Sequence, residues 1–245
     1  MRLSENPEAI HLLESEAHRA QREKNPDKIH WDCLSRNPGA IHLLEKNPKK
    51  INWWRLSENP AAIHLLEKNP EKIYWGNLSR NPSAIHLLEN NPEEINWYEL
   101  SKNPAAIHLL EKNPEKIDWD FLSDNPSAIH LLEKNPDKIS WRFLSRNPAA
   151  IKLIEYQLEN NPDNIDWSHL SYNPAAIHLL EKNQEKIDWD FLSDNPAAIK
   201  LLEKNPDKIN WCVLSYETTI FKSKNNEIYN YLYEIQNWIY KLELL

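Results

Sequence analysis

The sequence predicts an all-α protein: an α/α solenoid of nine two-helix repeats of about 22 residues each, followed by a C-terminal capping helix. Three observations predict this fold. A unit of the form L-S-x-N-P-x-A-I-H-L-L-E-K-N-P-x-K-I-x-W-x-x recurs over residues 3–215. All 17 prolines directly follow an asparagine, whereas only two glycines occur in 245 residues. Helices as short as this spacing allows are unstable alone in water, so neighbouring units must stack on one another.

The repeat has a regular period with two exceptions. Its first asparagine recurs at one constant interval, at Asn37, Asn59, Asn81, Asn103, Asn125 and Asn147. Flanking copies begin at Asn6, Asn173 and Asn195, and the intervals from Asn6 to Asn37 and from Asn147 to Asn173 are longer. The extra residues fall between the two Asn-Pro pairs of a unit, near residues 14–24 and 155–159. The predicted domains are a repeat solenoid over residues 1–215 and an amphipathic cap over residues 216–245.

Each Asn-Pro pair predicts the start of a helix. Asparagine is a favoured N-cap, because its side chain accepts a hydrogen bond from an otherwise unpaired backbone N–H. Proline suits the first helical position and pushes the residue before it out of the α region. In the unit that begins at Asn103, the two pairs predict a first helix from Pro104 to about Lys112 and a second from Pro114 to about Leu122.

The apolar residues indicate which faces of these helices are buried. In the first helix an alanine, an isoleucine and two leucines share one face about 160° wide, with the histidine opposite. The second helix has apolar residues on two sides, which favours burial between neighbours, and its acidic start suits a helix N-terminus. We expect the nine repeated tryptophans to pack in the core rather than to line an aromatic groove.

A leucine-rich repeat is the alternative fold, since it has a similar period and alternates a strand with a helix. The segment Ile117–Leu122 (IDWDFL) reads as a short strand in that case, but the leucine-rich signature is missing and the second Asn-Pro pair favours a helix start. In the tail, apolar residues from Ile228 to Leu242 recur at helical spacing and predict the cap. No matching cap precedes Asn6, so the first helix is either exposed or pairs with another chain.

Composition narrows the class of protein. The net charge of −8 disfavours a nucleic-acid partner, which needs a basic surface. No apolar stretch approaches the length that a membrane helix requires, so we expect neither a membrane span nor a signal peptide. Cys33 and Cys212 lie eight units apart, which predicts free thiols and a reducing compartment.

The sequence also predicts that the protein is not an enzyme and uses no cofactor. No phosphate-binding glycine loop, paired catalytic carboxylates or nucleophile arrangement stands out from the repeat. The recurring histidines, His42, His64, His86, His108 and His130, suggest metal ligands. However, stacked helices lie about 8–10 Å apart, too far for these histidines to share an ion. We therefore expect a solvent-facing ladder of histidines and no metal site.

Positions that vary among otherwise similar repeats are the candidates for partner binding. The least uniform positions lie around the tryptophan of each second helix, and exposed aromatic and arginine side chains are typical of binding hot spots. The expected partner-binding residues are Trp54, Arg55, Tyr74, Tyr98, Glu99, Arg142 and His169. The alternative is neutral variation at unconstrained surface sites.

The unit NPxAIHLLEKNPxKIDWxxLS resembles the short tandem repeats of proteins from giant DNA viruses that infect amoebae, over residues 3–215. The resemblance implies a viral protein in the host cytoplasm and carries no known activity. We therefore expect a non-enzymatic scaffold that mediates protein–protein interaction. The alternative is a structural component that self-assembles, as a homodimer or a larger oligomer, through its uncapped N-terminal end.

Overall fold

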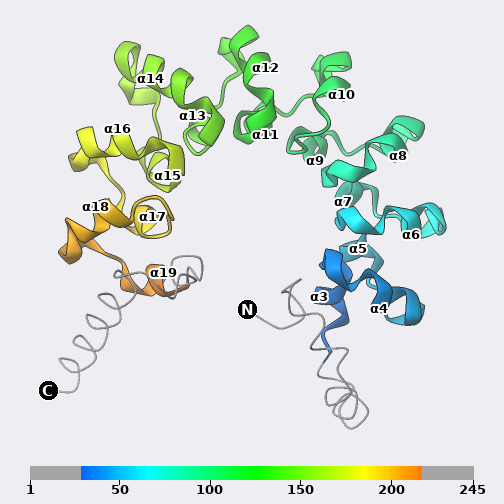
Figure 1. Ribbon diagram of the computed structural model, residues 1–245. Coiled ribbons are helices and arrows are strands. Elements are labelled where there is room, and N and C mark those ends of the chain that lie inside the picture. Colours follow the sequence, from blue (N-terminus) through cyan, green and yellow to red (C-terminus); the bar gives the residue numbers. More distant parts are fainter. Residues whose placement is uncertain (1–28, 217–245) are drawn as a thin grey trace, which may run out of the picture. The chain divides into compact units, whose positions relative to one another are not determined.

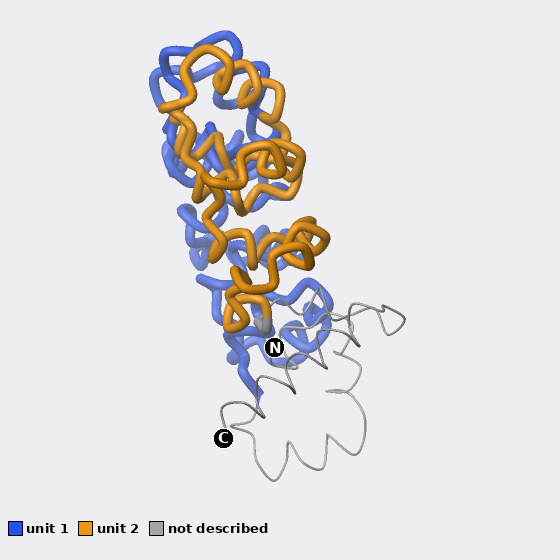
Figure 2. The backbone as a smooth tube through the Cα atoms, turned by 90° about the vertical axis from the view of Figure 1, so that its left-hand side faces the viewer, with its two compact units in different colours: residues 1–139 blue, residues 140–245 orange. Residues whose placement is uncertain are grey.

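The computed structural model describes residues 29–216. The chain divides into two compact units, Met1–Ile139 (unit 1) and Ser140–Leu245 (unit 2), shown in different colours in Figure 2. Within the described residues every regular element is a helix and none is a strand. The all-α repeat solenoid is therefore confirmed and the leucine-rich alternative is wrong. The insertion near residues 14–24 and all but the first residue of the predicted cap at 216–245 lie outside the described residues.

Each unit contains two rows of helices, which alternate along the chain (Figure 1). Helices of the Trp row begin at a tryptophan, and helices of the Ile row begin at an isoleucine. In unit 1 the Trp row comprises α3 (Trp31–Arg36), α5 (Trp53–Leu56), α7 (Trp75–Arg80), α9 (Trp97–Ser101) and α11 (Trp119–Asp124). The Ile row of unit 1 comprises α4 (Ile41–Lys46), α6 (Ile63–Glu67), α8 (Ile85–Asn90), α10 (Ile107–Lys112) and α12 (Ile129–Lys134).

Unit 2 repeats this arrangement. Its Trp row comprises α13 (Trp141–Leu144), α15 (Trp167–Tyr172), α17 (Trp189–Ser193) and α19 (Trp211–Tyr216). Its Ile row comprises α14 (Ile151–Asn160), α16 (Ile177–Lys182) and α18 (Ile199–Glu203). Neighbouring Trp-row helices pack on each other, as in the pairs α3 with α5, α7 with α9, and α15 with α17.

The first Asn-Pro pair of a repeat begins a short turn that leads into a helix, so the helix predicted from Pro104 to Lys112 is observed, but its α-helical part starts at Ile107. Asn125 Oδ1 accepts a hydrogen bond from the Ser127 N–H at 3.0 Å, and Pro126 begins a 3₁₀ turn that leads directly into α12. The equivalent turns before other Ile-row helices are η4 (Pro38–Ala40), η6 (Pro60–Ala62), η8 (Pro82–Ala84), η13 (Pro148–Ala150) and η15 (Pro174–Ala176). The N-cap role of this asparagine is confirmed.

The second Asn-Pro pair has a different role, and the predicted helix from Pro114 to Leu122 is wrong. The turn η10 (Pro114–Lys116) ends at Ile117, whose backbone is extended at φ −67° and ψ 127°. A separate helix, α11, then starts after Asp118, whose Oδ1 accepts from the Phe121 N–H at 3.1 Å. The residue before tryptophan caps the helix in the same way at Asn52, Asn96, Asp166, Asp188 and Asn210. At these positions an aspartate or asparagine N-cap therefore begins a new helix after the turn.

The second asparagine closes the preceding Ile-row helix. Asn113 Nδ2 donates to the Leu109 carbonyl oxygen at 2.8 Å, with the backbone at φ −134° and ψ 59°. Helices often end on a glycine in the left-handed region, where φ is positive. None of the described residues has a positive φ. Because an asparagine side chain satisfies the helix end without that conformation, the repeat has no need of glycine.

The core consists mainly of leucine and alanine from both rows. Ala106, Leu110 and Leu122 are fully buried, whereas His108 on α10 is exposed, as predicted for this helix. The repeated tryptophans are only half-buried. They therefore lie at the edge of the core, and the prediction that they pack inside it overstated their burial. The Lys116 Nζ of the next repeat covers the Trp97 ring at 4.7 Å from its centroid. Such a contact combines cation–π attraction with packing of the lysine stem.

Within each unit, buried asparagines and serines link one repeat to the next. Asn103 Nδ2 donates to the carbonyl oxygens of Ser79 at 2.9 Å and Asn81 at 3.2 Å, while its Oδ1 accepts from the Ala105 N–H at 3.0 Å. Ser101 Oγ donates within its own helix and accepts the Asp118 N–H at 3.0 Å. The asparagine bond to the serine carbonyl one repeat earlier recurs at Asn59, Asn81, Asn125, Asn173 and Asn195. Each hydrogen bond of this ladder between repeats joins a side chain to a backbone atom.

The longer interval near residues 155–159 lengthens one helix. The helix α14 has ten residues where α12 has six. Four added residues are close to one turn, so the buried face stays in phase. Ile154 and Gln157 are buried, Tyr156 is 64% exposed, and Asn173 still reaches the Ser145 carbonyl at 3.0 Å. The insertion thus extends the Ile row without disturbing the ladder.

Candidate functional site on the exposed face of the Trp row

The variable residues of the Trp row form a polar and aromatic face in each unit. They are the two residues after each tryptophan and the residue after each Leu-Ser pair. In unit 1 we define the unit 1 face by the following side chains of α3, α5, α7 and α9 and their ends: Asp32, Arg36, Trp54, Arg55, Glu58, Asn77, Arg80, Tyr98, Glu99 and Lys102. The short helices place these side chains next to those of the neighbouring repeat, at positions that the buried ladder does not use.

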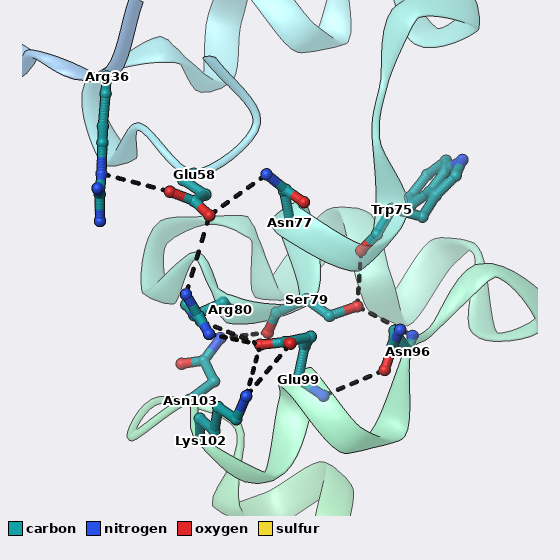
Figure 3. A network of polar contacts seen from close by, with 10 residues as sticks. All are labelled: Arg36, Glu58, Trp75, Asn77, Ser79, Arg80, Asn96, Glu99, Lys102 and Asn103. Atoms are coloured by element: carbon teal, nitrogen blue, oxygen red, sulfur yellow. Dashed lines mark hydrogen bonds and ion pairs between the residues drawn. The ribbon is translucent and has the colours of Figure 1, made fainter. Parts of the chain in front are cut away.

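A network of charges of both signs runs along the unit 1 face (Figure 3). Glu58 accepts from Arg36 Nε at 3.3 Å and from Asn77 Nδ2 at 3.3 Å, and Arg80 Nη1 lies 3.9 Å away. Arg80 Nη2 lies 2.9 Å from Glu99 Oε2, and Lys102 Nζ lies 3.2 Å from the same oxygen. The two glutamates are well covered, with 14% and 23% of their side chains exposed. Each of these repeats thus contributes one or two charged or polar side chains to a continuous network.

An aromatic cluster adjoins this network at α9. The rings of Tyr98 and Phe121 meet edge to face, with centroids 4.3 Å apart. Lys102 Nζ lies 4.1 Å from the Tyr98 centroid and 3.9 Å from the Phe121 centroid. The ammonium group therefore contacts two rings and the Glu99 carboxylate at once. Side chains held from several directions lose little conformational entropy when a partner binds, which favours affinity.

The other predicted residues of unit 1 include two exposed rings. Trp54 is 42% exposed, and the Arg55 guanidinium lies 4.5 Å above its ring. Tyr74 is 51% exposed and occupies the N-cap position of α7 without a side-chain cap bond. Large exposed aromatic side chains next to arginine are the composition of an interaction surface.

In unit 2 the predicted residues cluster around Asp166. Arg142 is 70% exposed with Nε 3.9 Å from Asp166 Oδ2. His169 is more covered, with Nδ1 3.0 Å from Asp166 Oδ1 and its ring stacked on Phe191 at 6.1 Å between centroids. Six of the seven predicted residues therefore form local groups: Trp54 with Arg55, Tyr98 with Glu99 through Lys102, and Arg142 with His169 through Asp166.

Several charged residues of the unit 1 face were missed from the sequence. Arg36, Glu58, Arg80 and Lys102 occupy one repeat position, directly after the Leu-Ser pair, and carry both signs of charge. The recurrence of charged residues at this one position was the available signal. To recognise this signal, one has to know that the serine lies near the end of a short Trp-row helix. The longer helix that we predicted from the sequence did not place the serine there.

The pKa of Asp166 is shifted by its surroundings. Burial raises the pKa of this carboxyl group, but the hydrogen bond from the His169 N–H, the His169 side chain and the Arg142 charge together lower it below its ordinary value. The ionised form is thus favoured in the folded protein.

This shift predicts a pH dependence of stability. A carboxyl group with a depressed folded pKa stabilises the fold above its unfolded pKa, near about 3.9, and that stabilisation is lost as the pH falls through the folded pKa. We expect the free energy of unfolding of the natural protein to exceed that of Asp166→Asn by a constant amount at neutral pH and by a shrinking amount below about pH 4. Denaturant titrations of both proteins over the neutral and acidic range measure this difference. Asparagine retains the N-cap, as it does at Asn52, so a difference that does not change with pH would contradict the assignment.

The histidine ladder of the Ile row is exposed at His86, His108, His130 and His178 and partly exposed at His42 and His64, and its members from His64 onward pair with glutamates. His108 Nε2 lies 3.0 Å from Glu89 Oε1, and His130 Nε2 lies 2.9 Å from Glu111 Oε1. The same bond from one repeat to the previous one recurs at His64, His86 and His178. Exposed pairs of this kind contribute about 0–1 kcal/mol each. The ladder is a modest link between neighbouring helices.

Among residues 29–216 no three or more histidine, cysteine or acidic side chains are arranged to hold a metal ion. Over the same range no helix has the length and apolarity needed to cross a membrane. Comparison of the chain with models of protein families, with curated proteins and with solved structures gave no match.

Proposed function

We propose that this protein is a non-enzymatic repeat scaffold that binds a protein partner through the unit 1 face. The observation that carries the proposal is the exposure of Trp54 and Tyr98, each with a cation over its ring, at positions that differ between repeats. Aromatic residues and arginines dominate the energy of protein interfaces. A row of short helices offers such residues over an extended surface rather than in one pocket, which suits a protein partner.

The resemblance of the repeat to those of giant viruses supports a viral protein that acts in the cytoplasm of an amoebal host. We include this origin in the proposal. It makes an extract of amoebal cells the natural source in which to look for partners.

The test compares capture of proteins by natural and altered chains. We expect the double substitution Trp54→Ala with Tyr98→Ala to reduce retention of specific partners at least about tenfold, because each truncation removes a large part of a hot spot. The matched control is Tyr156→Ala with His108→Ala, which removes two exposed rings from the Ile row. Quantitative mass spectrometry of the retained proteins measures the effect. Equal retention by all three chains would contradict the proposal.

A further inference from the structure

Four of the repeated tryptophans are covered by a lysine of the next repeat. In unit 1, Lys72 Nζ lies 4.7 Å from the centroid of the Trp53 ring, and Lys116 Nζ lies 4.7 Å from that of Trp97. The contact recurs in unit 2, where Lys186 covers Trp167 at 5.0 Å and Lys208 covers Trp189 at 4.7 Å. The tryptophan of this repeat therefore binds an ammonium group on its ring face, and the chain normally supplies that group itself.

Trp75 is the exception, because Glu94 stands where these repeats carry the lysine. For the other described tryptophans with a following repeat, the residues at this position are Lys50, Lys138 and Asn164. No cation of the part of the chain that the structure describes lies over the Trp75 ring. Trp75 is thus the described tryptophan with a carboxylate, rather than an ammonium group, at the covering position.

The backbone at Glu94 matches the backbone at the covering lysine of the next repeat. The turn η9 (Pro92–Glu94) ends at Ile95 with φ −64° and ψ 122°, and η10 ends at Ile117 with φ −67° and ψ 127°. The Glu94 side chain therefore leaves the chain at the same place relative to Trp75 as Lys116 does relative to Trp97. An ammonium group that enters from outside finds a carboxylate beside the ring.

The segment around Glu94 has also lost its other lysine. Residues 89–94 (ENNPEE) contain three glutamates and no lysine, whereas residues 111–116 (EKNPEK) contain two of each. The side chains of Glu93 and Glu94 are exposed, and neither forms an ion pair with a residue that the structure describes. A cation over the Trp75 ring thus gains electrostatic attraction to carboxylates in addition to cation–π attraction.

Two further departures from the repeat flank Trp75. Tyr74 stands at the N-cap position without a side-chain cap bond, and its ring is 51% exposed. Gly76 follows Trp75, although a Cβ atom there meets only Asn96 Nδ2, at an ordinary contact distance of 3.6 Å. Both residues disfavour the start of a helix, and packing does not require the glycine. Local choices that lower stability without a packing reason are typical of functional sites.

The Trp75 ring is separate from the charge network of the unit 1 face. Figure 3 shows the ring directed away from Arg80 and Glu99, although Trp75 and Arg80 belong to the same helix. None of the side chains that define the unit 1 face takes part in the contacts considered for Trp75. An inference about Trp75 is therefore independent of the proposed function.

We propose that Trp75 and Glu94 form a binding site for the ammonium group of a lysine side chain of a protein partner. The ammonium group lies over the indole ring, as Lys116 lies over Trp97, and pairs with the Glu94 carboxylate. A lysine is the expected group because a lysine occupies this place in the four equivalent contacts, with its stem packed on the ring. The exposed Tyr74 ring offers a polypeptide a second contact that a free amine lacks.

Nuclear magnetic resonance of the full-length protein tests the site through the indole N–H resonance of Trp75, identified by its loss in Trp75→Phe. The probe is the blocked peptide acetyl-Gly-Lys-Gly-amide, with its norleucine analogue as the neutral control. We expect the lysine peptide to shift the Trp75 resonance with a dissociation constant at least about tenfold lower than at Trp97, whose ring is already covered. The norleucine peptide is expected to cause no saturable shift. Equal affinity for n-butylammonium assigns the site to a free amine and overturns the protein partner.

Exchanging one residue between neighbouring repeats gives matched variants. Glu94→Lys supplies the covering lysine within the chain and is expected to abolish the saturable shift at Trp75. Lys116→Glu removes the cover from Trp97 and is expected to create a saturable shift there. The control Glu115→Lys makes the same change in net charge as Glu94→Lys at another exposed position and leaves binding at Trp75 intact.

Glu94→Gln removes only the charge, and it serves as the second variant should Glu94→Lys fail to fold by circular dichroism. We expect it to weaken binding at Trp75 several-fold. A natural protein without a saturable shift at Trp75 overturns the proposal. Binding that survives in folded Glu94→Lys or is unchanged in Glu94→Gln also overturns it, as does a Trp97 resonance that stays unchanged in Lys116→Glu. Capture of partners that depends on Trp54 and Tyr98 is unaffected by these outcomes.

Discussion

Replacing Asn103 with alanine is expected to lower the free energy of unfolding by about 3 kcal/mol, the sum of the lost cap on the turn before α10 and the lost buried hydrogen bonds. The side chain is fully buried and makes three hydrogen bonds, one to the Ala105 N–H in the turn that leads into α10 and two to carbonyl oxygens of the previous repeat. Loss of an N-cap costs about 0.5–2 kcal/mol. Each buried polar group left without a partner costs about 1–3 kcal/mol, and water has no access to replace the missing amide.

The second asparagine of the same repeat is the control for this prediction. Asn113 is half-buried and its amide donates to one carbonyl, that of Leu109. We expect Asn113→Ala to cost less than about 1 kcal/mol, since solvent can take over the bond. The variant Asn103→Asp separates capping from the ladder, because it keeps the acceptor and removes both donors. Urea denaturation followed by circular dichroism measures all three. Equal losses for Asn103→Ala and Asn113→Ala would show that the ladder contributes nothing.

Replacing Leu110 with alanine is expected to have an effect of similar size through packing. Its side chain is fully buried, and truncation of a buried leucine costs about 2–5 kcal/mol from lost transfer energy and the cavity left behind. On the same helix, Ile107 is only half-buried. Since the cost follows the apolar area removed from water, Ile107→Ala is expected to cost roughly half as much. The same denaturant titration compares them, and a larger loss at Ile107 would contradict the packing described here.

Much of the fold could be predicted because the same residue types recur at the same positions in many repeats. The position of the first helix, its buried face and the N-cap asparagine all followed from local rules that act within a single repeat. His108 on the exposed side and Ala106 with Leu110 on the buried side agree with a single helical period. Long-range contacts were not needed to reach these conclusions.

The second half of the repeat was predicted less well, because an Asn-Pro pair has one structural role in the first half of the repeat and another in the second half. Asn103 caps the turn that leads into a helix, whereas Asn113 closes the end of that helix, and both precede proline. The residue before each tryptophan, such as Asp118, marks the true start of the Trp-row helix. The local pattern read Asp118 as a variable surface residue, since its cap role depends on the extended backbone at Ile117.

The candidate site was predicted in composition but not in arrangement. Trp54, Tyr74 and Tyr98 are exposed, yet the charges beside them are joined to residues of the neighbouring repeats, such as Arg80 with Glu58 and Glu99. Such pairs depend on how repeats stack, which the spacing along the chain does not contain. The half-burial of the tryptophans has the same origin, because a lysine from the next repeat covers rings such as that of Trp97.

The ladder of buried asparagines and serines also bears on how such a chain can grow. Its bonds between repeats end on main-chain carbonyl and amide groups, which are identical whatever the neighbouring side chains are. A duplicated or deleted segment of one whole repeat therefore meets the same partners on both sides and keeps the buried asparagines and serines of the ladder paired. Length can change by whole repeats at nearly constant stability per repeat. Substitutions at the exposed positions of a new repeat then leave the hydrogen bonds to its neighbouring repeats unchanged.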